Sequence, residues 1–262
     1  MPVSPLFTGV GVALVTLFDD DGRLLVPQTI EHAADLVDRG VRAVVLAGST
    51  GEAWHLTFDE RVELCRAARE ALGTRVPLIL GTGSADRAEA VRLTIAAREA
   101  GADAALALSP AGEDDPRPYY EALAEAAGDM PLLGYHFPAV SPPGIPVEAL
   151  ADLPIAGCKD SSGDAERLLL ELHSWDGPLY VGSSAYLPLA GAVGATGAIL
   201  ALANTDPEGC IAAFSGDLDA QRALVDAHIE GHADFPAGLK RRLARLKGTP
   251  AAVRAGVPAA SG

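Results

Sequence analysis

Lys159 is the residue of this chain best suited to covalent chemistry. It ends a short apolar run in the stretch AGCKDSSGD, residues 156–164, and it is one of three lysines in a chain with 17 arginines. A guanidinium stays protonated, whereas an amine that has lost its proton can attack a ketone carbon and form an imine. Apolar surroundings favour that neutral amine. The alternative is a structural lysine paired with Asp160 or another carboxylate.

A phenol and two hydroxyls stand at the ends of two other apolar runs. Tyr135 lies in GYHFP, residues 134–138, and a tuned phenol can act as a general acid or base. Taken alone, such a tyrosine more often packs its ring in a core. Ser49 and Thr50 lie in GSTGE, residues 48–52, where hydroxyls and backbone N–H groups can hold a carboxylate or phosphate. A plain glycine-rich turn is the alternative, since no nucleoside-triphosphate loop pattern is present.

The elements that must position these residues alternate along the sequence. Short apolar segments indicate strands buried on both faces of a parallel sheet, over 9–18, 42–48, 76–83, 102–110, 131–137, 154–160, 178–184 and 196–204. Amphipathic segments predict helices over 27–39, 58–72, 84–100, 116–127, 163–174 and 184–193. The link over 139–152 is rich in proline and predicts at most a short helix from Val147. This alternation predicts a closed (β/α)8 TIM barrel, with an open doubly wound sheet as the alternative.

In a barrel of this kind, the working residues stand at the carboxyl ends of the strands. Ser49, Tyr135 and Lys159 all follow or end predicted strands. Beyond residue 205 the pattern becomes wholly helical, over 207–216, 218–230 and 237–246. We therefore expect a catalytic barrel domain over 1–205 and a C-terminal helical extension over 206–262.

Charge and composition exclude several classes of partner. A net charge of −15 argues against nucleic acid, because phosphates demand a basic face. No apolar run approaches the roughly 18 residues of a membrane span, and no secretory signal is present at the N-terminus. Cys65, Cys158 and Cys210 form neither a metal spacing nor a disulfide framework, and the histidines lack an HExxH pattern. We expect a cytoplasmic protein that binds no metal.

Four motifs in this order resemble the dihydrodipicolinate synthase / N-acetylneuraminate lyase family: GSTGE, YHFP, GCKDSSGD and VGSS…GATGAI. The similarity runs from about residue 7 to about residue 250. These enzymes are class I, Schiff-base aldolases and lyases that use pyruvate, and their fold is a (β/α)8 barrel with a C-terminal helical part. The resemblance implies a lyase that needs no cofactor, because the substrate is held as a covalent imine on Lys159.

The resemblance also implies individual roles. Lys159 would form the imine with pyruvate or another 2-oxo acid, and Tyr135 would carry protons to and from the substrate. Ser49 and Thr50 would hold the 2-oxo acid's carboxylate, and Ser49 would join Tyr135 in a catalytic proton relay. Two further residues would line the substrate pocket near the imine: Gly182 and Ile199.

Several positions depart from the family pattern. Dihydrodipicolinate synthases usually carry two tyrosines at the end of strand four, where this chain has Ala111 and Gly112; its own PYY, residues 118–120, is expected to begin a helix. Those synthases also carry an arginine where this chain has Val140. Sialic-acid lyases usually carry acidic residues where Ser183 stands. These differences disfavour both substrates.

The leading hypothesis is a Schiff-base-forming 2-oxo-acid aldolase or lyase that uses or releases pyruvate. Its partner would be an aldehyde, for example from sugar-acid breakdown, since the usual clamp for a second carboxylate is absent. One alternative is a dihydrodipicolinate synthase (4-hydroxy-tetrahydrodipicolinate synthase) with an altered relay. Another is a non-catalytic barrel that binds a 2-oxo acid. The resemblance implies a homo-oligomer, a dimer or a homotetramer. Relative to the family, we expect the C-terminal extension to be truncated, without the final helix of many members.

Overall fold

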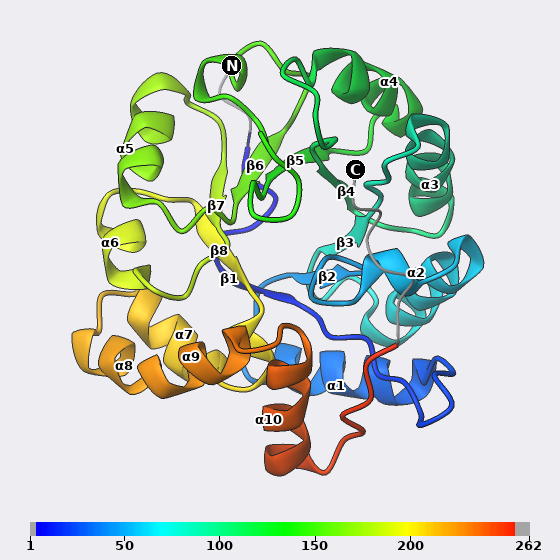
Figure 1. Cartoon of the computed structure of the whole chain (residues 1–262), viewed down its shortest axis with the longest axis vertical. Coiled ribbons are helices and arrows are strands. Elements are labelled where there is room, and N and C mark those ends of the chain that lie inside the picture. Colours follow the sequence, from blue (N-terminus) through cyan, green and yellow to red (C-terminus); the bar gives the residue numbers. More distant parts are fainter. Residues whose placement is uncertain (1–3, 255–262) are drawn as a thin grey trace.

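Eight parallel strands form a closed barrel in the computed structural model, which describes residues 4–254. Each strand pairs with its neighbours in the sequence, and β8 pairs with β1 to close the ring (Figure 1). The predicted TIM barrel is confirmed, and the open doubly wound sheet is wrong. The strands are β1 Gly9–Ala13, β2 Val44–Leu46, β3 Leu78–Gly81, β4 Ala104–Leu108, β5 Leu132–His136, β6 Gly157–Asp160, β7 Leu179–Val181 and β8 Gly197–Leu200.

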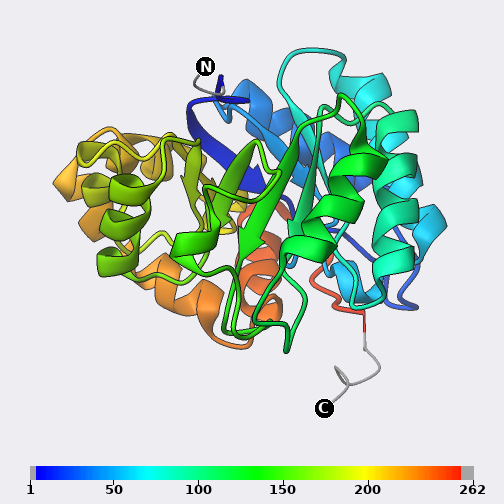
Figure 2. The ribbon, with the colours of Figure 1, turned by 90° about the horizontal axis from the view of Figure 1, so that it is seen from above.

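Helices surround this barrel on its outside (Figures 1 and 2). The α-helices are α1 Val26–Asp38, α2 Phe58–Leu72, α3 Arg87–Glu99, α4 Arg117–Ala127, α5 Ala165–Ser174, α6 Leu187–Ala192, α7 Pro207–Phe214, α8 Leu218–Ala223, α9 Val225–His232 and α10 Ala237–Lys247. Three short 3-10 helices are η1 Ala53–His55, η2 Val147–Ala149 and η3 Leu202–Asn204. The proline-rich link between β5 and β6 contains only η2, as the sequence predicts.

Local side-chain chemistry sets the helix ends, and some differ from the predicted bounds. α3 begins after Asp86, whose carboxylate accepts the N–H of Ala88 at 2.9 Å, while Ser84 instead donates to Glu89. The predicted start at Ser84 is therefore wrong by three residues. The helix predicted over 218–230 is divided into α8 and α9 at Leu224.

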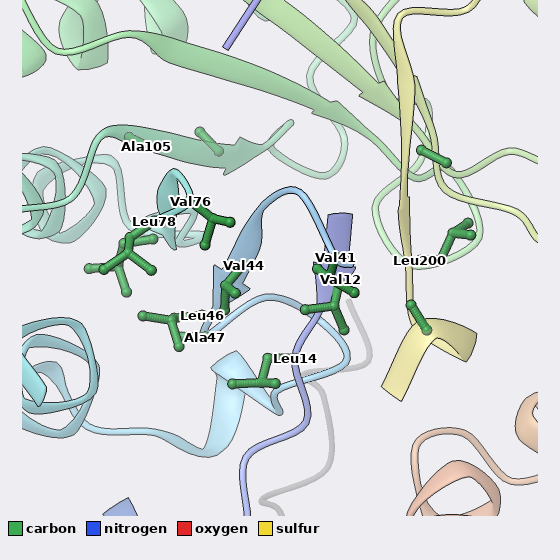
Figure 3. Close-up of a cluster of buried hydrophobic side chains, with 14 of the residues drawn as sticks. Val12, Leu14, Val41, Val44, Leu46, Ala47, Val76, Leu78, Ala105 and Leu200 are labelled. Carbon is green, nitrogen blue, oxygen red and sulfur yellow. The ribbon is translucent and has the colours of Figure 1, made fainter. Parts of the chain in front are cut away.

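Alternation along the strands divides the core into two layers. Inward-facing side chains, among them Tyr135, Tyr180 and Ile199, fill the barrel interior. Outward-facing ones, such as Val44 and Leu78, pack with neighbouring buried residues in the layer under the helices (Figure 3). Successive strand residues point to opposite faces, and both faces are covered, which explains why the strands are apolar except at the carboxyl ends of β5 and β6.

The last helices return to the barrel. α7 packs on β1, and α7 to α10 lie together beside β8 and β1 (Figure 1). Leu239 and Leu243 of α10 contact Val15 and Leu17, which follow β1. The proposed boundary at residue 205 thus falls just before a helix that contacts the barrel wall. The first three residues of the expected barrel domain and residues 255–262 of the expected extension lie outside the described residues.

A buried ion pair ties the C-terminal part to the turn after β2. Lys240 is fully buried, and its Nζ donates to the carboxylate of Glu52 and, at 2.8 Å, to the carbonyl of Ala252. The other oxygen of Glu52 accepts the backbone N–H of Arg254 at 2.9 Å. Glu52 directly follows the Ser49–Gly51 turn and has a left-handed φ of 57°. Two segments distant in sequence from this turn, α10 and residues 252–254, therefore hold it in place.

A second buried charged group lies on the outer side of β6, directly after Lys159. Asp160 accepts the N–H of Ser162 at 2.7 Å, and its carboxyl lies in the same pocket as Glu171 of α5. Arg167 approaches both carboxyls, at 2.7 Å for Glu171 and 3.7 Å for Asp160. Burial, with the adjacent negative charge of Asp160, raises the pKa of Glu171 to about 8. A single arginine, Arg167, therefore lies beside two buried carboxyl groups. A proton on Glu171 removes the repulsion between two negative charges that one guanidinium would otherwise have to balance.

Replacing Lys240 by methionine is expected to destabilise the fold by about 3–5 kcal/mol, because Glu52 would remain as a buried charge without its partner. The double variant Lys240→Met/Glu52→Gln should regain most of that loss. Lys247→Met is the matched control, since Lys247 pairs with Asp35 near the surface and should cost less than about 1 kcal/mol. Urea unfolding gives the free energy of unfolding of each of these variants. Equal losses for Lys240→Met and Lys247→Met would contradict the structural role of the buried pair.

Glu171 is expected to make stability depend on pH. Its pKa in the folded chain lies above its ordinary value of 4.5, so the folded state holds the proton more tightly. The stability from this proton is complete below about pH 4.5 and is lost as pH rises through about 8. Glu171→Gln, which stays neutral, should become more stable relative to the parent chain over this interval. Urea midpoints at several pH values test this, with the exposed Glu166→Gln as control; parallel profiles for all three proteins would refute it.

Candidate functional site

Strands β5 and β6 bring Lys159 and Tyr135 together. The two residues are register partners in the parallel ladder, and Lys159 is also opposite Tyr180 of β7. The Nζ of Lys159 lies 4.2 Å from the centre of the Tyr135 ring, and both side chains are 4% exposed. An ammonium at this distance over an aromatic face is attracted by the ring. The lysine therefore lies inside the barrel at the carboxyl ends of the strands, as expected.

The turn after β2 completes this group. The Oγ of Ser49 donates to the hydroxyl of Tyr135 at 3.5 Å. Ser49 and Thr50 are both buried, although they lie in a loop between β2 and η1. The three residues predicted to be catalytic, Lys159, Tyr135 and Ser49, thus form a continuous chain of contacts from β6 through β5 to the β2 turn.

Aromatic neighbours fix the position of Tyr135. The ring of Phe137 stacks against it, with centroids 5.8 Å apart and planes 23° apart. The hydroxyl of Tyr120 donates to the Ala107 carbonyl at 3.0 Å and accepts the backbone N–H of Tyr135 at 3.4 Å. Burial raises the pKa of Tyr120 well above its ordinary value, so this hydroxyl keeps its proton. Tyr119 and Tyr120 lie in helix α4, as the sequence predicts, and Tyr120 supports Tyr135 from behind.

Ile199 lies on β8 and Gly182 directly follows β7, on the side of the barrel next to β6. Ile199 of β8 is fully buried in the interior cluster that also contains Tyr135. Gly182 follows β7, where a Cβ would lie 1.9 Å from the Oγ of Ser161. No side chain larger than hydrogen fits there, so glycine leaves room for a hydroxyl at the residue two positions after Lys159.

A small hollow opens beside Tyr135 and Ser49. Trp54 of η1, Leu106 and Leu108 line it, together with the backbone of the β2 and β3 ends. The sequence prediction missed all three side chains. For Trp54 a signal was available, because one of the chain's two tryptophans stands two residues after GSTGE.

His136 points away from this hollow and has a structural role. Its Nδ1 accepts the N–H of Ile145 at 2.9 Å and so fastens the β5–β6 link. Burial lowers the pKa of this imidazole to about 4, which keeps the ring neutral. Within residues 4–254, no three His, Cys, Asp or Glu side chains gather closely enough to hold a metal ion. Over the same range, none of the helices has the length and apolar character needed to cross a membrane.

The positions that depart from the family pattern lie on two touching loops. The N–H of Gly112 donates to the carbonyl of Pro142 at 2.7 Å, which joins the β4–α4 loop to the β5–β6 link. Ala111 and Gly112 are exposed, and Val140 is 45% exposed. The positions that depart from the family pattern therefore lie at the exposed rim of the site, and none of them is among its buried residues.

The sequence of the chain matches one known protein family and individual members of it. The family model described as "Dihydrodipicolinate synthetase family" matches residues 6–246. A 4-hydroxy-tetrahydrodipicolinate synthase of Thiobacillus denitrificans is 35% identical over 235 residues, which cover 84% of this chain and 79% of the relative. The synthase of Methanoculleus marisnigri is 34% identical, with 84% and 80% covered.

Solved structures agree with this relationship. The prophage protein YagE of Escherichia coli, from the dihydrodipicolinic acid synthase family and solved in complex with pyruvate, has a TM-score of 0.88 and 27% identity. That likeness covers 97% of this chain and 93% of YagE. The dihydrodipicolinate synthase of Aquifex aeolicus has a TM-score of 0.87 and 27% identity, over 95% and 91%. The chain belongs to the dihydrodipicolinate synthetase family, and it is a carbon–carbon lyase of that family.

Proposed function

We propose that this protein is a Schiff-base aldolase or lyase that joins pyruvate to an aldehyde, or releases pyruvate from the corresponding hydroxy-2-oxo acid. The contact between the Lys159 amine and the Tyr135 ring, at 4.2 Å inside the barrel, is the observation that carries this proposal. A buried amine next to a phenol supplies a nucleophile and a proton carrier. Ser49 extends the proton path from the Tyr135 hydroxyl.

In the proposed reaction, the Lys159 amine attacks C2 of pyruvate, and water leaves as the imine forms. The protonated imine withdraws electrons from C3, so a C3 proton leaves and an enamine forms. The enamine carbon then attacks the aldehyde carbon, one carbon–carbon bond forms, and the aldehyde oxygen takes up a proton. Water hydrolyses the imine and releases the product and Lys159. The same steps in reverse cleave the bond.

The remaining residues would bind the 2-oxo acid. Ser49 and Thr50 would hold its carboxylate by hydroxyl and backbone N–H groups, and Tyr135 would pass protons at C3 and at the oxygen. Gly182 and Ile199 would line the pocket near the imine. No cofactor is required, because the covalent imine on Lys159 supplies the electron sink.

A second candidate is 4-hydroxy-tetrahydrodipicolinate synthase itself. The curated relatives named above carry that name at 34–35% identity, which favours it. Ala111, Gly112 and Val140 count against it, because that substrate's carboxylate and proton relay would lack their usual partners. We also propose a cytoplasmic homo-oligomer, a dimer or tetramer, built from a barrel over 1–205 and a helical extension over 206–262.

Borohydride trapping tests the Schiff base. Incubation with pyruvate and borohydride should add one reduced pyruvate unit to the chain, detected by intact mass. Lys159→Arg should abolish the adduct, whereas Lys247→Arg should keep it. The chain has three lysines, so peptide mapping assigns the site without ambiguity. Absence of any adduct at saturating pyruvate would overturn the aldolase proposal.

Tyr135→Phe is expected to lower turnover by about 100-fold or more, as for loss of a positioned acid–base group. Tyr186→Phe is the matched control, because the buried Tyr186 hydroxyl has no hydrogen-bond partner among the described residues. Pyruvate-dependent condensation measures both variants. Near-normal turnover of Tyr135→Phe would remove Tyr135 from the mechanism.

A further inference from the structure

A second, larger hollow opens outward beside the site. It shares Ser49 and Trp54 with the inner hollow beside Tyr135, so the two spaces adjoin at these residues. Its wall comes from the β2 turn, the β5 end, the α9–α10 connection and the segment before residue 255. A second substrate that approaches Tyr135 and its neighbour Lys159 from outside would meet this space.

The wall of the outer hollow is apolar. Trp54 is 57% exposed, Val140 45%, Val253 40% and Phe235 39%, and all four line the same space together with Phe137. Large apolar side chains gathered around one cavity mark a place where an apolar group is bound, because binding removes their surface from water. These residues come from four separate parts of the chain, so the fold assembles the wall.

The charged groups in this wall are already engaged. Arg254 donates to the carbonyls of His55 at 2.7 Å and Gly22 at 2.9 Å, and to both oxygens of Glu60. Its guanidinium is the only arginine or lysine group in the described lining. Both oxygens of Glu52 are also bonded, to Lys240 and to the Arg254 backbone.

Because these charged groups are engaged, the outer hollow is a poor binding site for a substrate carboxylate. A substrate carboxylate would have to displace Glu60 from Arg254 or remain without a cation, and desolvation without a partner is costly. Asp234 at the rim adds a negative charge, which Arg241 approaches at 3.1 Å. A polyhydroxylated chain would likewise find few free partners along this wall.

We propose that the second substrate is an aldehyde that carries an aromatic or branched apolar group and no carboxylate; this rests on the proposed Schiff-base function. The apolar group lies against Trp54, Val140 and Phe235, while the aldehyde carbon faces the enamine on Lys159. One carbon–carbon bond forms between that carbon and C3 of pyruvate, and the aldehyde oxygen becomes a hydroxyl. This differs from the sugar-acid aldehyde expected from the sequence.

A pair of equally shaped aldehydes tests the proposal directly. With pyruvate at saturation, kcat/KM for 4-methylbenzaldehyde should exceed that for 4-carboxybenzaldehyde by about tenfold or more. Glyceraldehyde should react more slowly than 3-methylbutanal. Equal rates, preference for the carboxylated member, or turnover of none of these aldehydes would overturn the proposal. The borohydride adduct with pyruvate is measured separately, so loss of the adduct identifies a failure of the Schiff-base function instead.

Substitutions in the wall of the outer hollow test whether its apolar residues determine the preference among aldehydes. Trp54→Ala should lower kcat/KM for 4-methylbenzaldehyde by about tenfold, whereas Leu218→Ala, which removes an equally exposed apolar side chain outside the hollow, should not. Val140→Arg supplies a free cation and should raise the rate with 4-carboxybenzaldehyde relative to 4-methylbenzaldehyde by about tenfold. Light scattering measures the oligomer mass and so tests the alternative that a second copy of the chain occupies the outer hollow. If Trp54→Ala lowers the oligomer mass and leaves aldehyde selectivity unchanged, the hollow is an interface and the proposal fails.

Discussion

The register between β5 and β6 is the constraint on which the site depends. Tyr135 and Lys159 are direct partners across these strands, and strand alternation turns both of them inward. A shift of one residue in either strand would turn one of them to the outer layer, where His136 and Asp160 now lie. The 4.2 Å contact between amine and ring therefore follows from backbone pairing more than from the attraction between the two groups.

The outer layer stabilises this register. His136 fastens the β5–β6 link through Ile145, and Asp160 shares a buried pocket with Glu171 of α5. Each of these outward residues directly follows an inward residue that is proposed to be catalytic, Tyr135 or Lys159. Polar groups under the helices thus fix the strand ends on one face, while the opposite face stays free for substrate.

Contacts from the end of the described chain reach the same site from the other side. Lys240 and the Arg254 backbone take up both oxygens of Glu52, next to the turn that carries Ser49. The Arg254 guanidinium is engaged separately, by Glu60 and by the carbonyls of His55 and Gly22, and Val253 and Phe235 contribute apolar surface beside it. In the proposed function, stability and substrate preference are therefore linked, because the charged groups of this wall are already paired within the fold.

The barrel could be predicted from sequence, because its apolar period and its glycine-ended helices are local features. The order of GSTGE, Tyr135 and Lys159 along the chain likewise singled out the candidate residues that the barrel brings together. Helix ends such as Asp86 depend on which side chain reaches the free N–H groups, so they were missed by a few residues. The apolar hollow could not be foreseen, since Trp54, Val140, Phe235 and Val253 are far apart in the chain and meet only after the barrel closes. Whether Arg254 is free or engaged likewise depends on long-range partners, and only tertiary structure decides that.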